Sequence, residues 1–154
     1  MDAVDEFIQL GVERVFPGQW EVIGGGFGTR IEVDNIGVLV IHSDRFIHFA
    51  SGLLSGLDFS EELVRSVSAM NCGGPFGSLV LSEGQPGHWM LAYGIKMMKT
   101  WFDPSSRAAP QLILDILNFI PGYVNNQAQE IQAEFGGEKW GVDESWWFVL
   151  MDHY

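Results

Sequence analysis

The sequence predicts an α+β fold, a twisted antiparallel sheet of about five strands with helices packed on one face. Apolar residues recur at helical spacing over residues 2–16, 59–71 and 108–135, and they alternate with a period of two between these segments. The chain has 154 residues, of which 47% are apolar and 18% charged, which suits one folded domain and excludes a disordered chain. The predicted order of elements is α-β-β-β-α-β-β-α.

The first helix is expected over residues 2–16. Val4, Ile8 and Val12 follow one another at a spacing of four and share one face of it. Pro17-Gly18 should end the helix, because proline cannot continue the backbone hydrogen-bond ladder.

Three strands are expected next, over residues 20–33, 36–42 and 45–51. The first of them contains the run GGGFG at 24–28, which we interpret as a bend or bulge in one long strand. The run lacks the Gly-Lys-Ser/Thr of a phosphate loop and leads into a strand, not a helix. Phosphate binding is therefore not expected here.

A second helix is predicted over residues 59–71, with Asp58 and Glu61 at the spacing of a capping box. A hairpin should follow, with arms at 76–82 and 87–96 and a turn rich in glycine and proline between them. Alternate residues of its second arm share one face, namely Trp89, Leu91, Tyr93 and Ile95.

The longest helix is predicted over residues 108–135. Pro121-Gly122 should kink or split it, and Gly136-Gly137 should end it. We therefore expect a chaperone-like α+β domain over residues 1–137. The tail at 138–154 is rich in aromatic residues and should dock on the domain or on a partner subunit, since so much exposed aromatic surface would be sticky.

No arrangement of side chains typical of catalysis stands out. His42 and His48 flank one turn and could in principle join Cys72 at a metal, but no histidine pair has the helical spacing of a metalloprotease, and partly buried structural histidines are the expectation. Cys72 follows a helix end, where the dipole disfavours a thiolate. We expect no catalytic residue, no cofactor and no metal.

The charge balance excludes several classes of partner. Eight Lys and Arg against 20 Asp and Glu give a net charge of −12, which argues against nucleic acid and anionic membranes. The N-terminus is acidic, unlike a secretory signal, and no apolar run reaches the length of a membrane span. A cytoplasmic protein is expected.

Surplus aromatic residues instead suit protein binding, because aromatic side chains are enriched at the cores of protein interfaces. The candidate partner-binding residues are Trp101, Phe102, Trp146, Trp147 and Phe148. A cationic cluster near the first two, formed by Lys96, Lys99 and Arg107, could grip an acidic partner segment or only balance local charge.

The sequence resembles the YbjN-type family. The resemblance rests on Asn71 after the second helix, on the hairpin GSLVLSEGQPGHWMLAYGI, and on the end of the long helix at 133–137, and it spans residues 2–137. It implies a fold like that of type III secretion chaperones. It also implies a small, acidic, dimeric protein without enzymatic activity, a chaperone or a regulator of sensory transduction, which binds extended partner segments along apolar patches.

The leading hypothesis is therefore a homodimeric protein-binding module that is not an enzyme. We expect the first and third helices to cover the sheet and the second to support a dimer or partner surface. An alternative is a regulatory protein that binds a small molecule in a pocket between sheet and helices. An enzyme of unrecognised type is a third reading.

Overall fold

The computed structural model describes the core of the chain and parts of its N-terminal segment. The described residues are 6, 10–14, 16–18, 20–23, 28–33, 36–73, 77–101, 105 and 109–139. The strands are β1 (Trp20–Ile23), β2 (Gly28–Val33), β3 (Ile36–His42), β4 (Phe46–Leu57), β5 (Ser78–Gln85), β6 (His88–Met98) and β7 (Glu138–Lys139). The helices are α2 (Glu61–Gly73), the short 3-10 helix η2 (Lys99–Trp101) and α3 (Ala109–Phe135), and residues 10–14 are also helical.

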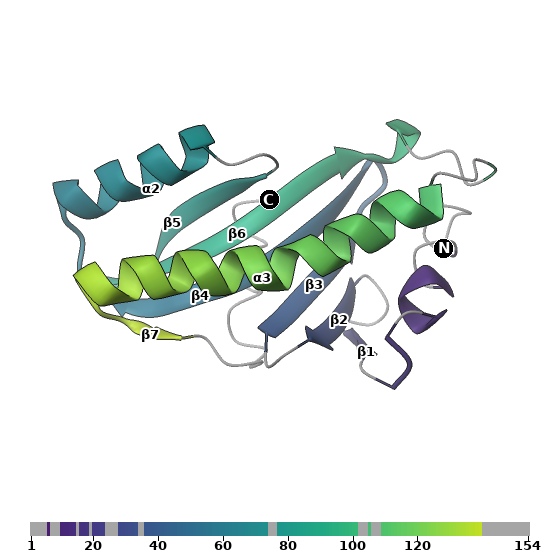
Figure 1. Ribbon diagram of the computed structural model, residues 1–154, viewed down its shortest axis with the longest axis horizontal. Coiled ribbons are helices and arrows are strands. Elements are labelled where there is room, and N and C mark those ends of the chain that lie inside the picture. Colours follow the sequence, from purple (N-terminus) through teal and green to yellow (C-terminus); the bar gives the residue numbers. More distant parts are fainter. Residues whose placement is uncertain are drawn as a thin grey trace.

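The strands form one antiparallel sheet in the order β1-β2-β3-β4-β6-β5, with β7 paired to β4. The α+β class and the antiparallel arrangement are as predicted. Figure 1 shows α3 running across β3 and β4 on one side of the sheet, with α2 beside β5 at the opposite end from β1. Among the described residues, no helix combines the length and apolar character needed to cross a membrane.

The predicted strand count of about five is wrong, because the sheet has seven strands. The segment predicted as one bent strand, 20–33, is two strands, β1 and β2. They pair antiparallel from Trp20↔Ile31 to Ile23↔Gly28, so the chain reverses direction between Ile23 and Gly28. A glycine-rich run suits such a reversal as well as it suits a bulge, and the sequence pattern does not separate the two.

The seventh strand, β7, follows α3 directly. Glu138 pairs with Ser55 and Lys139 with Leu54, so this two-residue strand lies beside the part of β4 that β3 does not reach. Two residues are too few for an alternating pattern, which is why the sequence did not predict a strand here.

The core lies between the sheet and the helices. Alternate residues of the strands face it, including Val38 and Val40 of β3 and Ile47 and Phe49 of β4, all of them buried. From α3 the core receives a stripe at helical spacing: Ile113, Ile116, Leu117, Ile120, Val124, Ala128 and Ile131. The N-terminal segment contributes Val12 and Phe16.

Helix α2 joins the same core and also keeps an exposed side. Leu63 and Val67 are buried, whereas Val64 and the preceding Phe59 are exposed. The capping residue is Ser60, whose Oγ accepts a hydrogen bond from the Leu63 N–H at 3.1 Å. The N-cap therefore lies two residues after the predicted Asp58, and with Leu63 as the third residue after it there is no capping box at Ser60.

Helix α3 is one continuous helix of 27 residues. Pro121 lies inside it and is buried, so the proline does not split the helix as the sequence allowed. Its neighbours Leu117, Ile120 and Val124 are anchored in the core, and this packing outweighs the hydrogen bond that proline removes. The predicted end is confirmed: Gly136 and Gly137 have φ of 76° and 86°, and the Gly136 N–H donates to the Gln132 carbonyl.

Candidate binding pocket

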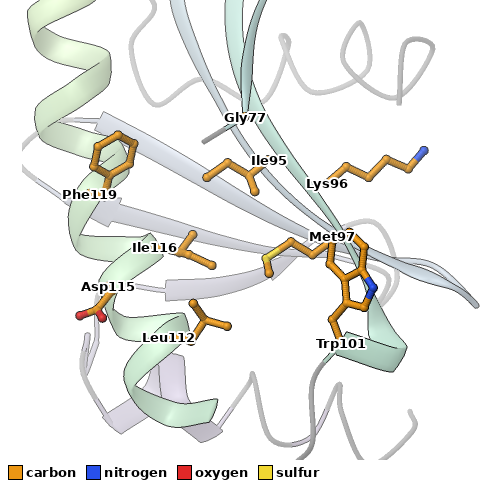
Figure 2. A pocket seen from close by; sticks show the side chains of 9 residues that line it. All are labelled: Gly77, Ile95, Lys96, Met97, Trp101, Leu112, Asp115, Ile116 and Phe119. Carbon is orange, nitrogen blue, oxygen red and sulfur yellow. The ribbon is translucent and has the colours of Figure 1, made fainter. Parts of the chain in front are cut away.

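An apolar pocket of about 300 Å³ opens between β6 and the N-terminal half of α3 (Figure 2). It lies on the helical side of the sheet and shares Ile95 and Ile116 with the hydrophobic core. Its wall comes from two segments that are distant in the sequence. The lining residues are Gly77, Ile95, Lys96, Met97, Trp101, Leu112, Asp115, Ile116 and Phe119.

The two walls follow from two periodicities. Ile95 and Met97 alternate along β6 and therefore project from the same face of the sheet. Leu112, Ile116 and Phe119 are four and three residues apart, so they lie on one side of α3. Figure 2 shows Leu112 and Ile116 directed toward Met97, and Phe119 on the same side of the helix nearer Ile95.

Both charged residues of the lining direct their side chains elsewhere. The Lys96 side chain extends away from the pocket (Figure 2), and its Nζ lies 4.4 Å from the centre of the Phe46 ring. The Asp115 carboxylate lies on the far side of α3 from the sheet, where its Oδ1 accepts a hydrogen bond of 2.7 Å from the Gln111 amide. The space itself is therefore bounded by hydrocarbon, sulfur and aromatic groups.

A cluster of three aromatic rings supports the inner end of the pocket. Tyr123 stacks on Phe119 with ring centres 5.2 Å apart, and it lies 4.8 Å from the Tyr93 ring. Burial, reinforced by the negative charge of Glu130, raises the pKa of Tyr123. This packing holds the Phe119 ring in place, so the α3 side of the pocket is preformed.

The strand start at Gly77 brings the backbone close to the pocket wall. Gly77 has φ of 51°, and a Cβ placed on it would lie 2.7 Å from Ile95 Cγ1. A side chain at this position would displace Ile95, so only glycine preserves the wall.

Trp101 lies at the edge of the pocket with 63% of its surface exposed. It ends η2, which is held by a 2.9 Å hydrogen bond from the Lys99 N–H to the Arg45 carbonyl. A large aromatic side chain is thus presented to solvent from a fixed backbone. Of the predicted partner-binding residues, Trp101 is placed at this pocket, and Phe102, Trp146, Trp147 and Phe148 lie outside the described residues.

The two described residues of the predicted cationic cluster beside Trp101 do not share one exposed surface. Lys96 is exposed and reaches over Phe46, whereas Lys99 is buried. The third member, Arg107, lies outside the described residues.

The titratable groups are dispersed. Within the described ranges, no three His, Cys, Asp or Glu side chains gather where they could hold a metal ion. The sheet pairs His42 with Ile47 and His48 with Ile41, so the two histidines are not cross-strand partners. Cys72 is free and exposed. His48 is buried, and burial, with a smaller effect of Lys96, lowers its pKa.

Sequence reasoning missed most of the pocket. It identified Ile95 and Ile116 as members of apolar stripes, but it did not identify Leu112 and Met97 as members of a site. The available signal was that Leu112 and Phe119 lie beside Ile116 of the core stripe and widen the apolar surface of α3. Only the fold shows that β6 lies opposite this stripe.

Comparisons with known proteins support the fold and give no family. No protein-family model matches the sequence, and no curated protein matches it. In structure, the chain is similar to YbjN from E. coli, described as "a putative transcription regulator". The TM-score is 0.58 at 9% sequence identity, over 83% of this chain and 90% of that one. At this identity the likeness establishes a YbjN-like fold alone.

Proposed function

We propose that this protein is a non-enzymatic binding module that receives an apolar side chain of a partner polypeptide in the pocket between β6 and α3. The observation that carries the proposal is the pocket itself, with hydrocarbon walls and Trp101 at its edge. Tryptophan in such a position is typical of the residues that dominate binding energy at protein interfaces. A space that the described residues line mainly with apolar groups is suited to bind and not to transfer protons.

The YbjN-like fold is consistent with a regulatory role, since the E. coli protein is described as "a putative transcription regulator". A net charge of −12 disfavours direct contact with DNA, because the phosphate backbone attracts clustered cations. A regulator with this charge would act by capturing a polypeptide. We propose that it works in the cytoplasm and without a metal or cofactor.

We further propose that the protein is a homodimer, with the exposed side of α2 at the contact. Phe59, 57% exposed, packs on Trp89 with ring centres 5.0 Å apart, and Val64 is exposed nearby on α2. Together they form an apolar surface at the end of the sheet opposite the pocket. The molar mass in solution, measured by light scattering, should be twice the 17.2 kDa of the chain. A mass of one chain at all concentrations would refute this part.

The binding proposal is tested by filling the pocket. A library of random peptides displayed on phage would be selected on the purified protein, and binding of the selected peptides measured with the variant Leu112→Trp. Leu112 is 41% exposed, so a larger ring can enter the pocket without rebuilding the core. We expect a loss of affinity of at least about tenfold, which corresponds to about 1.4 kcal/mol.

The matched control is Asn126→Trp, which adds the same ring at an exposed position of α3 that does not line the pocket. It should leave the affinity unchanged. Selected peptides that bind Leu112→Trp as well as the unchanged protein would contradict the assignment of the pocket.

A second function, binding of a small apolar molecule, is favoured by one observation. The volume of about 300 Å³ lies at the lower end of the range of ligand pockets in proteins. Native mass spectrometry of protein purified from its own cells would test it. A retained mass that is absent from Leu112→Trp would favour the small-molecule reading over the polypeptide.

A further inference from the structure

Three neighbouring strands at the centre of the sheet are buried on both of their faces. The burial is continuous over five residues of each strand, namely 37–41 of β3, 47–51 of β4 and 91–95 of β6. Successive side chains of a strand point to opposite faces, so a sheet with one face open to solvent would show buried and exposed residues in alternation. Both faces are therefore covered at the centre of this sheet.

The second face of the sheet is the one that carries Leu39, Ile41, Ala50 and Ala92. Leu39 pairs with Ala50 and Ala50 with Gly94, and the other two lie two residues away along β3 and β6. The four side chains are only 1%, 7%, 1% and 4% exposed. None of them belongs to the hydrophobic core that lies between the sheet and the helices.

The described helices bury their apolar residues on the other side of the sheet. Leu63 of α2, the apolar stripe of α3 and Val12 of the N-terminal segment all join the core that contains Val40 and Phe49. Val40 and Phe49 pair across β3 and β4 and alternate with Leu39 and Ala50, so they project from the helical face. Figure 1 shows α3 crossing the sheet on one side only. The second face is buried within a single chain, so its cover comes from the same chain.

The course of β7 directs the segment that follows it toward the second face. β7 is antiparallel to β4, and its last residue, Lys139, pairs with Leu54, so the chain leaves β7 running along β4 toward Ala50. The neighbour of β4 at Ala50 is already β3, and the segment must therefore leave the plane of the sheet. Since α3 packs on β3 and β4 from the helical face, the second face is the side left for it.

The segment after β7 has the length and the side chains that such a cover needs. Residues 140–154, which lie outside the described residues, can span up to ~50 Å when extended, whereas Leu54 and Ala50 are roughly 13 Å apart along a strand. The segment carries three consecutive aromatic residues at 146–148. Ala50 and Ala92 are small, and large rings packed over small residues fill a core without voids.

We infer that residues 140–154 pack on the second face of the sheet in the same chain, with the aromatic residues 146–148 over Ala50 and Ala92. The inference goes beyond the proposed function and does not depend on the pocket. It makes the segment a second layer of the domain, in which the burial of three rings stabilises the fold. These rings are then closed to a partner polypeptide, whereas Trp101 stays exposed and keeps the partner-binding role.

Photo-crosslinking in the full chain identifies what covers the second face. Trp147 is replaced by p-benzoylphenylalanine, which keeps a large aromatic group and, on illumination, forms a carbon–carbon bond to a C–H group beside it. We expect crosslinks within one chain to the segments around Leu39, Ala50 and Ala92, mapped by mass spectrometry. Crosslinks to α3, or to a second chain, would overturn the inference.

The reactivity of one buried alanine on each side of the sheet gives a second measurement. Ala50→Cys reports on the second face, and Ala128→Cys reports on the core between α3 and the sheet, where Ala128 is also buried. Both carry Cys72→Ser, because Cys72 is exposed and would itself react. Labelling by a maleimide should be slow at both positions in the otherwise unchanged chain.

The three rings are then removed together in one variant: Trp146→Ser, Trp147→Ser and Phe148→Ser. We expect Ala50→Cys to be labelled at least about tenfold faster in this background and Ala128→Cys to keep its slow rate, because only the second face loses its cover. Equal rates at Ala50→Cys with and without the rings would overturn the inference. The crosslinking experiment keeps it testable if the serine variant does not fold.

Discussion

At the scale of single residues, Asn71 shows how one side chain completes the sheet. β5 is the last strand in the sheet order, so one of its edges faces no other strand among the described residues. The Asn71 amide donates to the Leu79 carbonyl at 2.9 Å, and its oxygen accepts from the Leu79 N–H at 2.6 Å. The end of α2 thereby supplies both hydrogen bonds that a neighbouring strand would make at this position.

Replacing Asn71 by alanine should lower the free energy of unfolding by roughly 1–3 kcal/mol, because two partly buried backbone groups of Leu79 lose their partners. Urea unfolding followed by circular dichroism measures the change. The control is Asn126→Ala on the exposed side of α3, which should change stability by less than about 0.5 kcal/mol. Equal effects of the two variants would mean that the edge contact contributes nothing.

His48 predicts how stability depends on pH. Burial, then the charge of Lys96, lowers its pKa below the ordinary 6.5, so the folded state keeps a neutral imidazole where the unfolded state binds a proton. The stabilisation that comes from keeping His48 neutral is fully present above pH 6.5 and is lost as the pH falls below that value. The melting temperature should therefore decrease between about pH 7 and pH 5.

The variant His48→Gln cannot take up a proton and should show a flatter profile over the same interval. His88, which is exposed, provides the control, and His88→Gln should keep the full decrease. If His48→Gln and the unchanged protein lose stability in parallel, other groups are responsible.

At the scale of the elements, two glycines, one in the middle of α3 and one just after its end, should respond to alanine in opposite ways. Gly122 lies inside the helix, and a Cβ there would meet nothing within 4 Å. Gly137 has φ of 86°, and a Cβ there would lie 2.8 Å from Leu57 Cδ2 and 3.0 Å from the Ser55 carbonyl. Gly122→Ala should raise stability by about 0.5–1 kcal/mol, since glycine is a poor helix former.

Gly137→Ala, by contrast, should lower stability by more than about 1 kcal/mol, because the new methyl group strains the backbone and disturbs the pairing of β7 with β4. Chemical denaturation of the two variants beside the unchanged protein measures both effects. A gain of stability in Gly137→Ala would contradict the description of this turn.

The elements predicted best from sequence are those with long, regular patterns. The apolar stripe of α3 and the alternation in β6 predicted both elements within a few residues, since each is specified by many side chains. The predictions were wrong where only a few residues determine the local structure. The reversal between β1 and β2, the capping by Ser60 and the two-residue β7 depend on local backbone geometry that a periodicity does not encode.

At the scale of the whole molecule, the pocket could not be predicted because its two walls meet only in the folded chain. Ile95 and Met97 come from β6, and Leu112 and Phe119 come from a helix that begins eleven residues after β6 ends. Each of these apolar stripes, taken alone, is typical of residues that pack in a hydrophobic core. Composition favours binding by aromatic residues on an acidic protein, which stays a prediction, whereas the location of the pocket required the fold.

The net charge of −12 also predicts how the folded chain responds to salt. Twenty acidic groups against eight basic ones repel one another more strongly in the compact state than in the expanded unfolded chain. Of the ion pairs in the described part of the chain, Arg65–Glu61 is highly exposed with 3.7 Å between its charged atoms, so its loss on screening costs little. Screening should therefore remove more repulsion than attraction.

We expect the melting temperature to rise by a few degrees as NaCl increases from about 0.02 M to about 0.3 M, and then to level off as the screening length falls below the spacing of surface charges. KCl at equal ionic strength should give the same curve, because the effect depends on charge and not on the identity of the ion. A melting temperature that falls with salt would mean that attractive pairs outweigh the repulsion.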